Sequence, residues 1–203
     1  MRLGVCVSGQ GTNLRNLVEK GFEVVAVATN RPSCGAAAFA HERGLPVGEL
    51  SQKRFNSVEA RDAAMRDFFR AFGVELVVDA GYDRVHTAAF LDAFAGRIIN
   101  VHPSLLPEFA GGMDAIEQAL RAKATRTGVT VHVVTHDLDA GPILIQEAVP
   151  IHPDDTLETL TQRIHQAEYR VLPAAIFKME SRLAEGSPRT QGEPLRGSSE
   201  FVG

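Results

Sequence analysis

Residues 99–107, with the sequence INVHPSLLP, place an amide and an imidazole at the end of an apolar run. Asn100 and His102 are two positions apart, so on a β-strand their side chains project to the same side. An amide donor beside an imidazolium stabilises a developing oxyanion, and the imidazole also moves a proton. A histidine before a proline is also typical of a hydrogen-bonded loop. The stretch alone leaves both interpretations open.

A second polar stretch, THDLDAGP, places Asp137 and Asp139 just before a Gly-Pro pair. A carboxylate beside an imidazolium orients the ring and favours its charge, although Asp-rich sequences also form ordinary turns. His132 and His136 have the spacing that binds zinc on a helix. Here they lie on or beside a strand, where four residues span roughly 13 Å. We therefore expect no metal.

A third stretch, SGQGTNL, brings Gly9 and Gly11 to the point where a strand turns into a helix. A dinucleotide fingerprint is excluded because Leu14 occupies the position of its third glycine. The sequence also lacks the Gly-Lys-Ser/Thr of a P-loop. Thr12 and Asn13 after the glycines could cradle one phosphate at a helix N-terminus. A tight strand-to-helix turn with a polar cap is an equally good interpretation.

The elements that must position these residues alternate along the first half of the chain. Apolar runs of strand length alternate with segments of helical periodicity, and Ser57 is placed to cap one of them. The predicted strands are 3–7, 22–29, 74–80 and 97–101, and the predicted helices are 13–20, 34–44 and 58–73. This alternation predicts an α/β fold with a mostly parallel twisted sheet and helices on both faces.

The second half follows a different pattern. Only six residues separate the strand-like runs 128–135 and 142–150, too few for a crossover helix. They should pair as an antiparallel ribbon over 128–150. A helical pattern follows from 156 to about 182. We expect one domain over 1–184, with one half to about residue 100 and a second half after it, and a loose Gly- and Pro-rich tail over 185–203.

The composition limits the kinds of molecule that the protein is expected to bind. The 203 residues include 23% charged and 44% hydrophobic residues, with a formal net charge of -4. This balance gives no electrostatic footprint for nucleic acid or an anionic membrane. Cys6 and Cys34 stand far apart, which indicates neither a disulfide framework nor a thiolate metal site. Without a leader or a long apolar stretch, we expect a soluble cytoplasmic protein.

Taken together, SGQGTNL, NVHPSLLP and GVTVHVVTHDLDAGPILIQEAVP resemble the phosphoribosylglycinamide formyltransferases of purine biosynthesis. The order and spacing of the motifs agree over residues 1 to about 182. The resemblance implies a Rossmann-like formyltransferase fold and transfer of a formyl group from 10-formyltetrahydrofolate, a cosubstrate, to the amine of 5-phosphoribosylglycinamide. It also implies small-molecule partners only, no metal, and a monomer or homodimer.

The resemblance assigns roles to individual residues. The catalytic trio corresponds to Asn100, His102 and Asp139. The residues that match the phosphate and ribose site are Gly11, Thr12, Asn13 and Glu168. The residues that match the folate site, several of them through backbone groups, are Arg61, Asp83, Arg84, Val85, His86, Asn100, Thr135, His136, Asp137 and Asp139.

Two stretches depart from the family pattern. After Pro107 the chain reads EFAGGMDAIEQAL, with Glu108 and two glycines and without the histidine that relatives often carry there. Gly111 and Gly112 in this stretch could form a mobile flap over the substrate. AGYDRV also places a charge at Asp83. A related enzyme acting on another amine, such as a sugar nucleotide, and a folate-binding pseudoenzyme are therefore the alternative functions.

Overall fold

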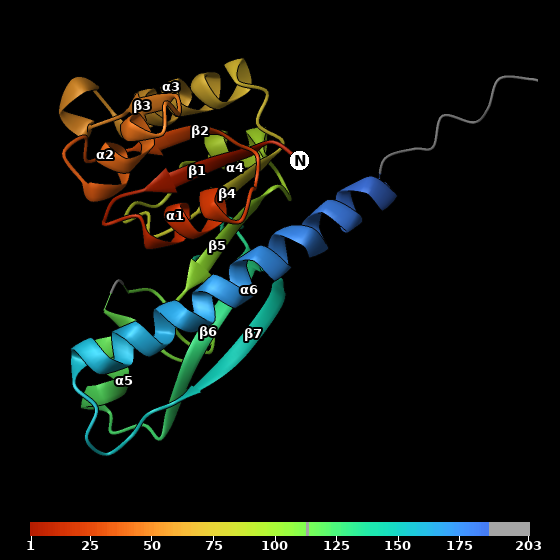
Figure 1. Cartoon of the computed structure of the whole chain (residues 1–203). Helices are drawn as coiled ribbons and strands as arrows, with labels where there is room; N and C mark the ends of the chain where they lie inside the picture. Colours follow the sequence, from red (N-terminus) through yellow and green to blue (C-terminus); the bar gives the residue numbers. More distant parts are fainter. Residues whose placement is uncertain (113, 187–203) are drawn as a thin grey trace, which may run out of the picture.

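A seven-stranded sheet organises the described part of the chain, residues 1–112 and 114–186 of this computed structural model (Figure 1). The strand order is β3-β2-β1-β4-β5-β6-β7. The first five strands are parallel, β6 is antiparallel to β5, and β7 is antiparallel to β6. The bounds are β1 Leu3–Val7, β2 Val24–Thr29, β3 Val47–Glu49, β4 Leu76–Asp79, β5 Ile98–His102, β6 Arg126–Val133 and β7 Ile143–Pro150.

Helices cover both faces of the sheet because the central strands are apolar on both sides. Two separate clusters of buried side chains mark these faces. The first is covered by α1 Thr12–Glu19, α2 Gly35–Glu42, α5 Ala115–Arg121 and α6 Leu157–Gly186, and the second by α3 Val58–Ala71 and α4 Ala88–Ala93. The long α6 lies across β6 and β7 (Figure 1).

The predicted architecture is confirmed. The mostly parallel sheet, the ribbon of β6 and β7 and the helices on both faces all form. The Ser57 side chain caps α3 by accepting a hydrogen bond from the Ala60 N–H at 3.1 Å. The sequence analysis missed β3, α4, α5 and the 3-10 turn Gln52–Arg54, all of which are short.

The C-terminal boundary differs slightly from the prediction. Helix α6 continues to Gly186, two residues beyond the expected domain end at 184. The rest of the expected tail, 187–203, lies outside the described residues. The antiparallel pairing of β5 with β6 was also not anticipated. This pairing matters for function because it places Asn100 directly opposite His132.

The strand order of the sheet changes direction between β1 and β4. From β1 the chain adds β2 and β3 on one side, and then β4 and β5 on the other. At such a switch point the loops after neighbouring strands diverge and leave a crevice at the carboxyl edge. The loops after β1, β4 and β5 all reach this edge, which is where a ligand is expected.

Candidate active site

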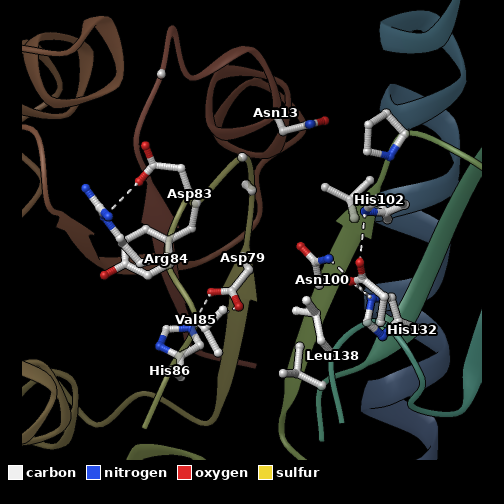
Figure 2. A pocket seen from close by; sticks show the side chains of 18 of the residues that line it. Asn13, Asp79, Asp83, Arg84, Val85, His86, Asn100, His102, His132 and Leu138 are labelled. Atoms are coloured by element: carbon white, nitrogen blue, oxygen red, sulfur yellow. Dashed lines mark hydrogen bonds and ion pairs between the residues drawn. The ribbon is translucent and has the colours of Figure 1, made fainter. Parts of the chain in front are cut away.

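A cavity of about 500 Å³ lies at the carboxyl edge of the sheet (Figure 2). Its walls come from the loops after β1, β4 and β5, the loop between β6 and β7, and one face of α6. All three motifs identified in the sequence therefore meet in one place. Of the predicted site residues, every one except Arg61 lines this cavity.

One end of the cavity is formed by the glycine loop after β1. Gly11 has φ 76°, a left-handed conformation, and a Cβ there would lie 2.6 Å from the Cβ of Ala36. Only glycine fits this position without displacing α2. Helix α1 starts immediately afterwards at Thr12, so its N-terminal N–H groups and partial positive charge face this end. The arrangement suits an anion.

A buried carboxyl group lies beside this loop. Glu168 of α6 is 6% exposed and accepts a hydrogen bond from the Asn13 side-chain amide at 2.9 Å. Burial raises the pKa of Glu168 to about 7, against the smaller opposing effect of the Asn13 bond. Near neutral pH this group exchanges its proton readily, and it is placed to accept hydrogen bonds from hydroxyl groups of a ligand.

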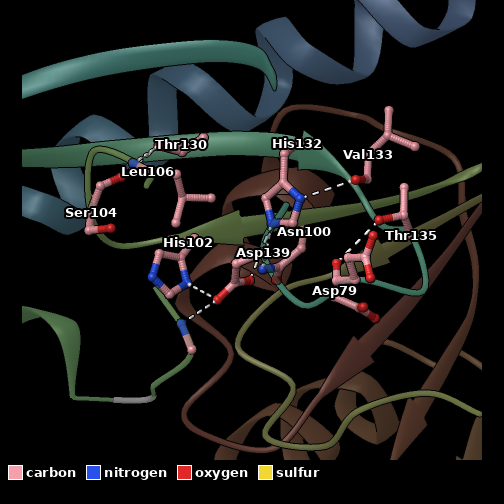
Figure 3. A network of polar contacts seen from close by, with 12 residues as sticks. Asp79, Asn100, His102, Ser104, Leu106, Thr130, His132, Val133, Thr135 and Asp139 are labelled. Carbon is pink, nitrogen blue, oxygen red and sulfur yellow. Dashed lines mark hydrogen bonds and ion pairs between the residues drawn. The ribbon is translucent and has the colours of Figure 1, made fainter. Parts of the chain in front are cut away.

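Strand β5 presents the amide and the imidazole as predicted. It ends at His102, and both Asn100 and His102 line the cavity. The His102 Nδ1 lies 3.7 Å from a carboxylate oxygen of Asp139, and its Nε2 lies 3.1 Å from the Phe109 carbonyl oxygen (Figure 3). Both ring nitrogens thus face acceptor groups, an environment that suits an imidazolium with two N–H donors.

Asp139 is held by groups from three elements. It adopts φ 52°, its carboxylate lies 3.5 Å from the His132 Nε2, and it accepts a hydrogen bond from the Gly111 N–H at 2.8 Å. The interaction with His132 is the largest cause that lowers the pKa of Asp139, and the Gly111 N–H and the His102 charge lower it further against the effect of burial. Asp139 is therefore a stable carboxylate at neutral pH.

His132 is a site residue that the sequence analysis missed. It lies on β6, is 2% exposed, and its Nε2 is 3.2 Å from the Asn100 side-chain nitrogen. Its Nδ1 is 3.1 Å from the Val133 carbonyl oxygen, which fixes the ring orientation. The sequence analysis considered His132 only as a zinc partner of His136. The β5–β6 register, which no local pattern reveals, places it against Asn100 and Asp139.

The opposite wall is formed by residues 83–86 after β4 and by the loop after β6. Val85 and Leu138 are exposed apolar side chains at 66% and 58%, and both line the cavity. Asp83 turns away to bond with Ser8 and Asn30. The remaining predicted folate-site residues on this wall are Arg84, His86, Thr135, His136 and Asp137.

Arg61 is the exception among the predicted residues. It lies on the buried face of α3, one turn before Met65, and is 2% exposed. Its guanidinium is paired with Asp62 at 2.6 Å. The structure therefore does not bring Arg61 to the cavity, and a buried arginine needs such a partner for its charge. Arg61 matches the folate site of the family in sequence only, because its side chain does not reach the cavity.

The atypical stretch after Pro107 contacts His102 and Asp139. The Phe109 carbonyl oxygen faces His102, and the Gly111 N–H bonds to Asp139. Phe109 and Gly111 both have positive φ, 56° and 81°. The unusual sequence thus contributes two contacts to the polar cluster of His102 and Asp139.

The fold and the cavity define a class of enzyme. A doubly wound sheet that carries an amide, an imidazole and a carboxylate opposite an anion-binding helix terminus suits transfer of an acyl-type group to a phosphorylated acceptor. Comparison with known families then gives a specific match. The sequence pattern of the family described as formyl transferase matches residues 1–176, and the chain belongs to this family.

Individual relatives agree. The chain is 36% identical over 184 residues to the phosphoribosylglycinamide formyltransferase of Bacillus subtilis, covering 88% of this chain and 94% of that protein. The solved structure of phosphoribosylglycinamide formyltransferase from Bacillus halodurans superposes with a TM-score of 0.85 at 39% identity, covering 90% of this chain and 97% of that one.

Longer proteins also match. The chain is 37% identical over 181 residues to the trifunctional purine biosynthetic protein adenosine-3 of Bos taurus, covering 86% of this chain. It spans only 18% of that protein's length. Among the described residues, no helix is long and apolar enough to cross a membrane.

Proposed function

We propose that the protein transfers the formyl group of 10-formyltetrahydrofolate to the amine of 5-phosphoribosylglycinamide, in the cytoplasm. The observation that carries this proposal is the meeting of Asn100, His102 and Asp139 in one cavity with the Gly11 loop at its other end. One end binds an anion without chemistry, and the other provides groups for acyl transfer. Phosphoribosylglycinamide, the substrate in the names of the relatives, likewise carries a phosphate at one end and the reacting amine at the other.

The phosphate of the acceptor binds at the Gly11 loop and the N-terminus of α1, with Thr12 and Asn13 at its sides. Glu168 next to Asn13 accepts hydrogen bonds from the ribose hydroxyls. These contacts lie away from the reacting amine. They position the amine against the formyl carbon and so lower the entropic part of the barrier.

The formyl donor occupies the wall formed by residues 83–86 and 135–139. Val85 and Leu138 cover its apolar surface, and backbone groups of both loops meet its polar edge. The formyl carbon then lies next to Asn100 and His102. The reaction needs no covalent intermediate on the protein.

Attack of the amine on the formyl carbon generates a tetrahedral oxyanion. The Asn100 side-chain N–H and the His102 imidazolium stabilise this charge. Asp139 holds His102 in orientation and balances its charge. The proton that the amine loses is passed within this cluster to the folate nitrogen that leaves, so the charges on both sides of the reaction are balanced.

The test is an assay of folate product release with 10-formyltetrahydrofolate and 5-phosphoribosylglycinamide. His102→Ala should lower kcat roughly 100- to 1000-fold, because one group that stabilises the oxyanion is lost. His152→Ala, an exposed histidine outside the cavity, is the matched control and should retain full activity. Full activity in His102→Ala would refute the assignment.

The acceptor is tested in the same assay. An amine without the phosphate, and an amino sugar nucleotide, should each react far more slowly than 5-phosphoribosylglycinamide because neither fits the Gly11 loop. A preference for the sugar nucleotide would support the alternative acceptor. Binding of the folate without turnover of any amine would identify a folate-binding pseudoenzyme.

A further inference from the structure

Three potential metal ligands converge at the cavity wall, apart from the cluster of Asn100, His102 and Asp139. Cys6 comes from β1, Asp79 ends β4, and His86 follows in the loop (Figure 2 labels the last two). One ligand atom from each lies within 4.8 Å of the others, and all three side chains are buried. The His86 Nε2 is 3.0 Å from both carboxylate oxygens of Asp79. No other such group occurs among the residues that the structure describes.

The His86 ring is held in place by its neighbours. It is stacked between Tyr82, at 5.2 Å between ring centroids, and Phe90, at 4.4 Å. Its Nδ1 is buried and has no hydrogen-bond partner among the described residues, so the ring lacks the second N–H bond that usually orients a metal-binding histidine. The stacking on both faces instead holds the ring, with Nε2 directed at Asp79.

Cys6 and Asp79 are register partners on the neighbouring strands β1 and β4. The Cys6 Sγ contacts the Met65 sulfur at 3.9 Å, which is a weak acceptor. A divalent cation between the thiol and the Asp79 carboxylate would attract both groups and displace the thiol proton.

We propose that Cys6, Asp79 and His86 bind a zinc ion. A thiolate, an imidazole and a carboxylate form a zinc donor set, whereas magnesium and calcium prefer oxygen ligands. Zinc bonds of about 2.0 to 2.3 Å in a tetrahedral site place the ligand atoms roughly 3.3 to 3.7 Å apart, so the ion would replace the His86–Asp79 contact at 3.0 Å. Asp79 and His86 also line the cavity, so the ion enters from there and its fourth position faces the cavity. Binding releases the thiol proton.

Cobalt(II) is the probe that tests this site. The full chain, freed of metal by a chelator, should bind one cobalt ion with the near-ultraviolet charge-transfer absorption of a cobalt–thiolate bond. Zinc should displace the cobalt and abolish this absorption. Zinc affinity should also rise with pH, because the thiol proton is released. Cobalt bound without the thiolate band would overturn the proposal, since histidines of the catalytic cluster would then be the ligands.

Two variants identify the ligands. Cys6→Ser should abolish the thiolate band, whereas Cys34→Ser, the matched control at the N-terminus of α2, should retain it. His86→Gln should weaken zinc binding by more than the roughly 10- to 100-fold that loss of an outer-shell partner costs. Circular dichroism checks that each variant folds. Equal zinc binding by wild type and folded Cys6→Ser would refute the site. The formyl transfer proposed above uses none of these three side chains as a catalytic group, but His86 belongs to the wall proposed for the folate. Cys6→Ser, which lies outside the cavity lining, is therefore the variant that distinguishes failure of the zinc site from failure of formyl transfer.

Discussion

Two carboxyl groups face the same cavity, and their surroundings shift their pKa values in opposite directions. Asp139 is held below its usual pKa, mainly by His132, with the Gly111 N–H and the His102 charge contributing (Figure 3). The pKa of Glu168 is raised to about 7 because burial dominates and Asn13 is its single hydrogen-bond donor among the described residues. The two groups therefore differ both in burial, which is deeper at Glu168, and in the number of donors and positive charges around them.

In the proposed reaction, this difference separates the two ends of the cavity by function. At the end with Asn100 and His102, a permanent carboxylate would orient His102 while charge moves. At the end with the Gly11 loop, a titration near neutral pH would let Glu168 ionise when ligand hydroxyls donate to it, which offsets the free-energy cost of its burial. The cavity thus keeps Asp139 charged and leaves Glu168 close to half-protonated at neutral pH.

The largest expected effect comes from neutralising Asp139, the carboxyl group whose pKa is lowered. Asp139→Asn keeps the shape of the side chain but removes the charge beside His102, so kcat should fall roughly 100- to 1000-fold. Steady-state kinetics at pH 7 measures this. Asp67→Asn, an exposed pair partner of Arg66 on α3, is the control and should be unaffected. A loss below tenfold would show that the Asp139 charge is not required.

Glu168→Gln should change stability in a pH-dependent way. Because the folded-state pKa of Glu168 lies above its usual 4.5, the folded state binds more protons than the unfolded state between pH 4.5 and about 7. The wild type therefore loses stability as pH rises through this window, and the variant does not. At pH 8 the variant should be more stable by up to about 3 kcal/mol, and at pH 4 by almost nothing.

Urea unfolding of both proteins at several pH values measures this difference. Glu158→Gln is the matched control, since this exposed residue lies on the same helix α6. Its stability relative to wild type should not change between pH 4.5 and 7. A constant difference between Glu168→Gln and wild type across this range would contradict the raised pKa.

Removing the main partner of Asp139 should have a smaller effect. His132→Gln removes the largest cause of its lowered pKa, so this pKa should rise toward 3.8. The acidic limb of the kcat/KM profile should move to higher pH. Since a hydrogen bond to a charged group is worth roughly 1.5–3 kcal/mol and about 1.4 kcal/mol is a factor of ten, kcat should also fall roughly 10- to 100-fold. A slower enzyme with an unmoved acidic limb would assign His132 a purely structural role.

Much of the fold was predictable from local patterns. Buried parallel strands are continuous apolar runs, and the long helices show clear periodicity and a Ser57 cap. The short elements β3 and α4 were missed because three to six residues carry too little periodicity. The β5–β6 pairing depends on contacts distant in sequence, and a single strand does not reveal its neighbour.

The candidate site was predictable where one sequence motif contains several of its polar side chains. Asn100 and His102 share a strand, and their spacing can be read directly from the sequence. Side chains that meet from different strands or loops could not be found from local sequence patterns. His132 lies opposite Asn100 only through strand pairing, and Cys6 meets Asp79 and His86 only through sheet order. Arg61 is the opposite case: the sequence correspondence assigns it to the folate site, whereas α3 turns its side chain inward, away from the cavity.

The smallest expected effect comes from removing the one hydrogen-bond donor described for Glu168. The Asn13 amide is the hydrogen bond that favours the charged form of Glu168, so Asn13→Ala should raise the pKa of Glu168 above its value of about 7. One neutral hydrogen bond limits this rise to less than about one pH unit. Carbon-13 NMR titration of labelled glutamate measures it. Asn16→Ala is the matched control, because Asn16 on the same helix donates instead to the Tyr169 carbonyl. An equal rise in both variants would mean that burial, altered by loosened packing of α1 on α6, and not the donor, sets this pKa.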